Sequence, residues 1–159
     1  MRDDSDLPDS DAFDAALMER DHTLSAVRKV EHALSRAAGA EAWIDDLRSS
    51  LVSLQDAMAE EKDELDRPGS LLAMISSERP RRFRPRVRGV KEQYDDIVRQ
   101  LDSFRRELDD VDSAVADIGE IRHRVEWIIR ALRNCRNRQA DLVFDALGLD
   151  FGGPRGNPE

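Results

Sequence analysis

Two Glu-x-x-His strings are the residues of this chain whose types and spacing could bind a metal ion. They run from Glu19 to His22 and from Glu120 to His123. Residues three apart share one face of a helix, so a carboxylate and an imidazole at this spacing can hold the same ion. Di-iron carboxylate bundles use this spacing on helices whose ligands point into the bundle. The direction in which each string points therefore decides its chemistry.

The histidines are predicted to point away from the core. Successive helical residues are about 100° apart around the axis. At that spacing, His22 lies roughly opposite the apolar stripe that contains Leu17 and Leu24. His123 lies opposite the stripe of its own helix, and His32 projects sideways. We therefore predict that all three are solvated surface residues rather than metal ligands.

The elements that carry these residues are predicted to be four helices. Aromatic residues make up 5% of the chain and charged residues 37%, and helix formers dominate. Apolar residues recur three and four apart over about 11–37, 41–66, 86–109 and 112–148. These lengths and spacings predict an all-α protein, an up-down-up-down four-helix bundle.

The connections between the helices are less uniform. Gly39 is a candidate end of the first helix, and Pro85 is expected near the start of the third. The apolar patch from Leu71 to Ile75 is expected to fold back onto the bundle end. The junction at 109–113 contains neither Gly nor Pro, so a tight turn and a continuous helix both remain open.

The domain boundaries follow from composition. Residues 1–10 are expected to form an acidic flexible tail, 11–150 the bundle, and 151–159 a flexible C-terminal tail. The acidic start lacks the order of a signal peptide, and no apolar run is long enough to cross a membrane. A single cysteine, Cys135, cannot form an internal disulfide, so a cytoplasmic location is expected.

Charge and motifs narrow the function classes. The formal charge of −9 argues against general binding to nucleic acid or to anionic membranes. The chain has no Gly-rich phosphate loop, no zinc-ligand spacing and no Ser/His/Asp or Cys/His constellation. We therefore do not expect an enzyme.

Three runs along the predicted helices resemble bacterial hemerythrin-like (HHE cation-binding) domains. They are Leu54 to Glu61, Arg86 to Val98, and Cys135 to Ala146 with the closing Leu149-Asp-Phe-Gly-Gly segment. The resemblance covers about 12–153 and depends on helix order, apolar phase and that closing segment. It implies a four-helix bundle with a non-haem di-iron centre that binds or senses oxygen or iron.

The resemblance also implies where ligands would lie. The family's histidine and carboxylate positions match Asp21 on the first helix, Ala57 and Glu61 on the second, Tyr94 on the third and Cys135 on the fourth, with Gln139 or Ala140 at the last carboxylate position. A one-residue slip would place His22 in the first position, but among surface residues. Only Glu61 keeps the family's chemistry. The set Asp21, Glu61, Tyr94 and Cys135 could hold one metal through oxygen and sulfur donors, yet we expect no cofactor and no iron.

The remnants of this site are expected to form a structural cluster. Tyr94 could donate a hydrogen bond to Glu61 or Asp21, while Cys135 packs as a small apolar residue. A small-molecule pocket and a redox-sensitive thiol are the alternatives. Arg136 and its neighbour Arg133 could lower the pKa of a solvent-accessible Cys135.

A basic connection over 79–91 is the other candidate site. Its partner-binding candidates are Arg81, Arg82, Arg84, Arg86 and Arg88. They could dock an acidic protein partner. Alternatively, they pair with acidic residues of neighbouring helices or of the N-terminal tail. Binding to nucleic acid is disfavoured because the acidic remainder would repel a duplex.

Three functions remain open. The preferred one is a non-catalytic interaction or regulatory protein on a hemerythrin-like frame that has lost its di-iron site. The alternative is a residual metal-binding protein, for iron or another cation, in oxygen or redox sensing. The third is a homo-oligomeric structural protein whose helices pair between chains.

Overall fold

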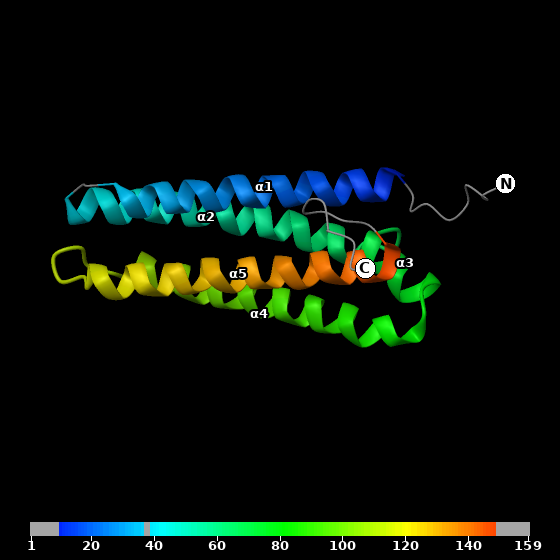
Figure 1. Cartoon of the computed structure of the whole chain (residues 1–159). Coiled ribbons are helices and arrows are strands. Elements are labelled where there is room, and N and C mark those ends of the chain that lie inside the picture. Colours follow the sequence, from blue (N-terminus) through cyan, green and yellow to red (C-terminus); the bar gives the residue numbers. More distant parts are fainter. Residues whose placement is uncertain (1–9, 37–38, 149–159) are drawn as a thin grey trace, which may run out of the picture.

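Four long helices lie side by side in the computed structural model, which describes residues 10–36 and 39–148 (Figure 1). They are α1 (Ser10–Ser35), α2 (Ala40–Asp66), α4 (Arg84–Asp109) and α5 (Ile118–Leu147). Each packs against its neighbour along the chain, which is consistent with an up-down bundle. The short α3 (Leu71–Glu78) and a 3-10 turn over Arg81–Phe83 join α2 to α4. The prediction of an all-α four-helix protein is confirmed.

The core follows the apolar spacing of the sequence. On α4 the buried residues alternate three and four apart, which places all of them on one face: Val87, Val90, Tyr94, Ile97, Leu101, Phe104 and Leu108. Burial of each large apolar side chain contributes about 1.5–3 kcal/mol relative to leaving it in water. None of the described helices is long and apolar enough to span a membrane.

Arginines from other helices cap the C-terminal ends of α1 and α4. Arg122 Nη1 donates to the Leu34 carbonyl at 2.7 Å, beside the Trp43 indole N–H, which donates to the same oxygen at 3.3 Å. Arg48 donates through Nε and Nη2 to the Leu108 carbonyl at 3.0 and 2.7 Å. The last carbonyls of a helix have no partner within it and carry partial negative charge, so a guanidinium is well suited there.

The connection before α5 differs from both expectations for it. The helix begins at Ile118 rather than near 112, and residues 110–117 form a loop. Within it, the Ala114 N–H donates to Asp112 Oδ1 at 2.9 Å. The Asp117 side chain accepts from the Glu120 N–H at 3.1 Å and caps α5. These aspartates bind backbone donors in the loop and in the first turn of α5, which is how a junction without Gly or Pro stops being helical.

The first residues of α2, α3 and α4 differ from or refine the predicted ones. Gly39 begins α2 as its N-cap rather than ending α1. The apolar patch at 71–75 forms α3, whose N-cap is Ser70. Most of the basic connection at 79–91 is helical, because α4 already begins at Arg84 with a proline in its first turn. Both predicted tails lie almost wholly outside the described residues, as does the closing 149–153 segment.

Candidate functional site

Each of the four long helices contributes one polar side chain to a cluster inside the bundle. Glu61 lies on the buried stripe of α2 between Met58 and Leu65 and is 3% exposed. The other members are Thr23 of α1, Tyr94 of α4 and Arg136 of α5, all buried. A buried carboxylate requires compensation, so these three side chains determine what the interior can do.

Three hydrogen bonds converge on one oxygen of Glu61. Thr23 Oγ1 donates to Glu61 Oε2 at 2.6 Å, and the Tyr94 hydroxyl lies 3.0 Å from the same atom. Arg136 Nη2 donates to it at 3.3 Å and to the Arg20 carbonyl at 3.1 Å. Side chains from all four long helices therefore meet at one carboxylate. The predicted hydrogen bond between Tyr94 and Glu61 is confirmed.

Burial keeps the cluster's charge states simple. Burial raises the pKa of Tyr94 far above its usual range, and the nearby Glu61 charge raises it further, so the phenol remains a neutral donor. Burial also lowers the pKa of Arg20, with repulsion from Arg136 as the next cause. Arg136 supplies the positive charge that pairs with Glu61. The cluster is therefore a closed, largely neutralised network.

Asp21, Ala57 and Cys135 of the predicted site do not share the hydrogen bonds of Glu61 among the described residues. Asp21 is exposed, so its predicted inward position is wrong, and Thr23 takes that place. Leu17 and Leu24, which indicate the predicted register on α1, are only half-buried, whereas Val30 lies on the Thr23 face and is fully buried. Ala57 is half-buried and offers no ligand atom.

Cys135 is buried near the cluster without sharing its hydrogen bonds. It is 1% exposed, and its Sγ lies 3.8 Å from the Val90 carbonyl oxygen. Burial raises the pKa of the thiol to about 11, with the Glu61 charge as the second cause. The arginines nearby act in the opposite direction but are outweighed, so the alternative of a lowered pKa is wrong. Packing as a small apolar residue is confirmed.

This donor set does not fit a di-iron centre. One carboxylate, one phenol and one hydroxyl replace the several imidazoles and bridging carboxylates that two iron ions need. The guanidinium of Arg136 already holds the place of a cation beside Glu61. Gln139 and Ala140 instead line a cavity of about 30 Å³ together with Leu17 and Arg20.

The three histidines are exposed, as predicted. His22 nevertheless has two carboxylates beside it, from Glu19 on its own helix and Glu60 on α2. His123 lies at the edge of a groove between α4 and α5 and shares no such cluster among the described residues.

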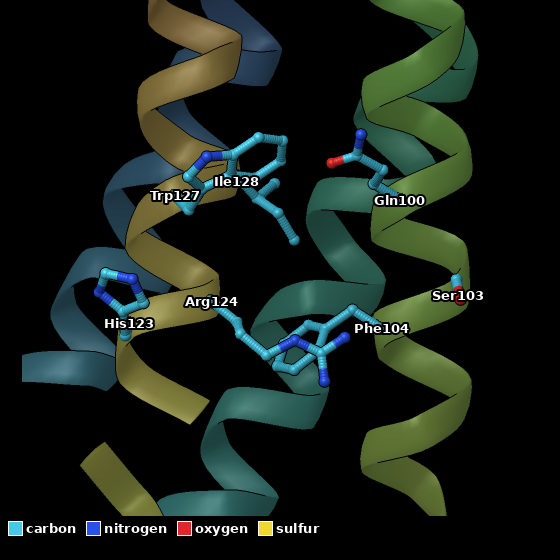
Figure 2. A pocket seen from close by; sticks show the side chains of 7 residues that line it. All are labelled: Gln100, Ser103, Phe104, His123, Arg124, Trp127 and Ile128. Carbon is cyan, nitrogen blue, oxygen red and sulfur yellow. The ribbon is translucent and has the colours of Figure 1, made fainter. Parts of the chain in front are cut away.

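The groove beside His123 is a hollow of about 300 Å³ (Figure 2). Arg124 reaches from α5 toward the ring of Phe104 on α4, with its guanidinium carbon 4.5 Å from the ring centre. It also pairs with Glu107, which lowers the pKa of that carboxyl through the hydrogen bond. Trp127 and Gln100 lie on opposite sides of the groove, and Trp127 is 47% exposed.

The basic candidates divide into paired and unpaired side chains. Arg86 Nη1 pairs with Asp145 of α5 at 2.9 Å, and Arg84 Nε donates to the Ser76 carbonyl at 3.0 Å. Within the described part of the chain, no ion pair involves Arg81, Arg82 or Arg88. The Arg82 guanidinium lies 4.9 Å from the ring centre of buried Phe83. Pairing with neighbouring helices therefore explains only part of the stretch.

Comparison with protein-family models, with curated proteins and with solved structures gave no match to this chain. The interpretation of the site therefore depends on its own geometry. Two of its residues, Thr23 and Arg136, were missed from the sequence. The sequence does contain a signal for Arg136. A carboxylate at Glu61 that points into the core requires a buried cation, and Arg136 directly follows Cys135, which is predicted to point into the core.

Proposed function

We propose that this chain is a non-catalytic interaction or regulatory protein, built on a hemerythrin-like bundle that has lost its di-iron site. The observation that supports this most is the network around Glu61, in which Thr23, Tyr94 and Arg136 donate to a single carboxylate oxygen. In such a site, an ion would have to displace a guanidinium from a buried carboxylate, which is costly.

The interior cluster also lacks what catalysis needs. Its members are buried and are held by the bonds to Glu61, with Glu61 and Arg136 each about 95% shielded from solvent. Tyr94 is held as a neutral phenol by burial, so it is a poor general base. These features favour a function that depends on the surface of the bundle rather than on its interior.

The basic connection over 79–91 forms a basic end of the bundle. We propose that this basic end contacts an acidic protein partner. Arg81, Arg82 and Arg88 are exposed, and the Arg82 and Arg86 guanidinium groups lie over the buried ring of Phe83. Arginine suits such a surface because its planar guanidinium binds carboxylates in two-point geometry and stacks on aromatic rings. A basic cluster on a chain of net charge −9 also concentrates positive potential at one place.

Iron analysis tests the first half of this proposal. The untagged protein is purified from iron-supplemented cells, and iron per chain is measured together with the visible spectrum. We expect well below 0.1 iron per chain, on the order of background, and no oxo-to-iron charge-transfer band. Near-stoichiometric iron with such a band, lost in Glu61→Gln, would overturn the proposal and favour the residual metalloprotein.

A fluorescent peptide rich in glutamate and aspartate tests the second half. We expect binding that weakens as salt rises and falls at least about tenfold in Arg81→Glu/Arg82→Glu. The matched control is Arg99→Glu/Arg106→Glu, which makes the same charge change on the outer side of α4 where both arginines already pair with aspartates. Equal loss in both variants would mean that net charge alone governs binding, and would reject the basic end as the docking surface.

A further inference from the structure

We propose that Glu19, His22 and Glu60 form a surface site for a divalent transition metal of the zinc class, separate from the interior cluster. His22 Nδ1 lies 3.8 Å from Glu19 Oε2 and 3.9 Å from Glu60 Oε2. All three ligand atoms lie within 4.8 Å of one another, with one carboxylate and the imidazole from α1 and the second carboxylate from α2.

The donor set matches zinc in type, charge and size. Zinc binds imidazole nitrogen and carboxylate oxygen at about 2.0–2.2 Å, so ligand atoms of a tetrahedral site lie roughly 3.4 Å apart. The spacings of 3.8 and 3.9 Å need only small side-chain rotations to reach that value. Two carboxylates and a neutral imidazole balance a dication, and the side open to solvent leaves water as the fourth ligand.

The burial of Glu19 points to a cation independently of the spacing. Its side chain is 17% exposed, and its Oε2 atom is shielded from solvent with no hydrogen-bond donor among the described residues. A shielded carboxylate oxygen without a donor is costly. The same atom is the one that faces His22, so an ion bound there would satisfy it.

The second Glu-x-x-His string is an internal comparison. Glu120 and His123 have the same spacing on α5 and are both exposed. In the part of the chain that the structure describes, no third ligand approaches them, whereas Glu60 of α2 completes the first set. Both strings therefore have the same spacing along one helix. They differ because only the first has a carboxylate of a neighbouring helix, Glu60, beside it among the described residues.

The ion would also join two helices at the level of the interior network. His22 precedes Thr23, and Glu60 precedes Glu61, so the site lies directly outside the Thr23–Glu61 hydrogen bond. A ligand that binds only the folded chain stabilises it in proportion to its concentration over Kd. Zinc should therefore raise the melting temperature of the protein.

Zinc titration of the metal-stripped, untagged full chain tests the site, by calorimetry and by competition with a zinc-binding dye. We expect one ion per chain, with at least about tenfold weaker binding in His22→Ala and in Glu60→Gln. His123→Ala and His32→Ala are the matched controls and should bind as the unmodified chain does. Zinc should raise the melting temperature of the unmodified chain and of both controls, but not of His22→Ala.

The opposite results reject the site. Absence of binding up to millimolar zinc does so, as does equal loss in His123→Ala, which would indicate nonspecific uptake. Cobalt gives a second readout, since its absorption bands report coordination by nitrogen and oxygen directly. Bands that persist in His22→Ala would also contradict the proposal. These outcomes are distinct from iron at Glu61, because the side chains of His22 and Glu60 are exposed and donate no hydrogen bond to Glu61 among the described residues.

Discussion

At Glu61, one buried carboxylate oxygen accepts from a hydroxyl, a phenol and a guanidinium that come from three different helices. A buried ion pair adds little net stability by itself, because removing both charges from water offsets their attraction. Removing one partner is much worse, since the other charge then stays buried without compensation. Changing one member of the cluster should therefore cost more stability than the intact ion pair contributes.

Replacing Arg136 with methionine should test that asymmetry. Methionine keeps a long apolar stem but leaves Glu61 uncompensated, so we expect the free energy of unfolding to fall by about 3–5 kcal/mol. The double variant Glu61→Leu/Arg136→Met should lose clearly less than the sum of the two single changes. Urea unfolding at neutral pH measures both. Additive losses would show that the two charges do not depend on each other.

Thr23 allows a nearly isosteric test of its hydrogen bond. Thr23→Val removes the donor 2.6 Å from Glu61 and keeps the shape, so a loss of about 1.5–3 kcal/mol is expected for a bond to a charged group. Thr23→Ser keeps the hydroxyl and should lose less. The comparison is made by urea unfolding, and equal losses in the two variants would assign the effect to packing.

Cys135 should react slowly in the folded protein. Its thiol has a pKa of about 11 and is 1% exposed, so little accessible thiolate exists at pH 8. We expect modification by a thiol reagent to be at least about a hundredfold slower than in urea-unfolded chain. Because the folded form holds this proton more tightly, its contribution to stability is present below about pH 9 and is lost as pH rises toward 11. Cys135→Ala should weaken that alkaline loss, and rapid native labelling would contradict the burial.

At the scale of helices, the sequence predicts which faces are buried better than where helices end. The regular apolar spacing on α4 predicts its whole buried face, Tyr94 included, because only one register fits. On α1 the buried face includes the small residues Thr23 and Ala26, so a register drawn through Leu17 and Leu24, which are only half-buried, is rotated from the observed one. The end of α4 depends on Arg48, which lies sixty residues away in sequence and has no local signal.

Arg48 offers a test of that long-range cap. Arg48→Met removes the donors to the Leu108 and Val111 carbonyls but keeps an apolar stem. We expect a loss of about 1–2 kcal/mol and faster hydrogen exchange confined to the last turn of α4, since unsatisfied carbonyls at a helix end weaken that end first. Arg106→Met is the matched control, because Arg106 is near the same helix end but its ion pair, with Asp102, lies at the surface. Equal fraying in both variants would argue against the cap.

At the scale of the whole molecule, arginine side chains of α5 contact α1 at several places. Arg133 of α5 pairs with Glu31 of α1, and Arg122 and Arg136 of α5 donate to backbone carbonyls of α1. A hollow of about 400 Å³ lies along this seam. The α1–α2 packing is the closest, whereas α2 and α4 pack about as closely as α4 and α5, and the contacts between α1 and α5 form a polar seam.

The exposed surface of the described residues has no large apolar patch, so we predict that the chain is a monomer. The large apolar side chains exposed in the described residues are scattered over different elements: Met18 on α1, Val52 on α2, Val115 in the 110–117 loop and Trp127 on α5. A stable interface buries about 800 Å² per partner around an apolar centre, which isolated residues do not supply. The net charge of −9 adds repulsion between copies. Light scattering should therefore give the chain mass of 18.1 kDa at roughly 100 µM protein and moderate salt. A doubled mass that returns to the chain mass in Trp127→Glu, but not in Val52→Glu, would instead establish a homodimer through the α4–α5 groove.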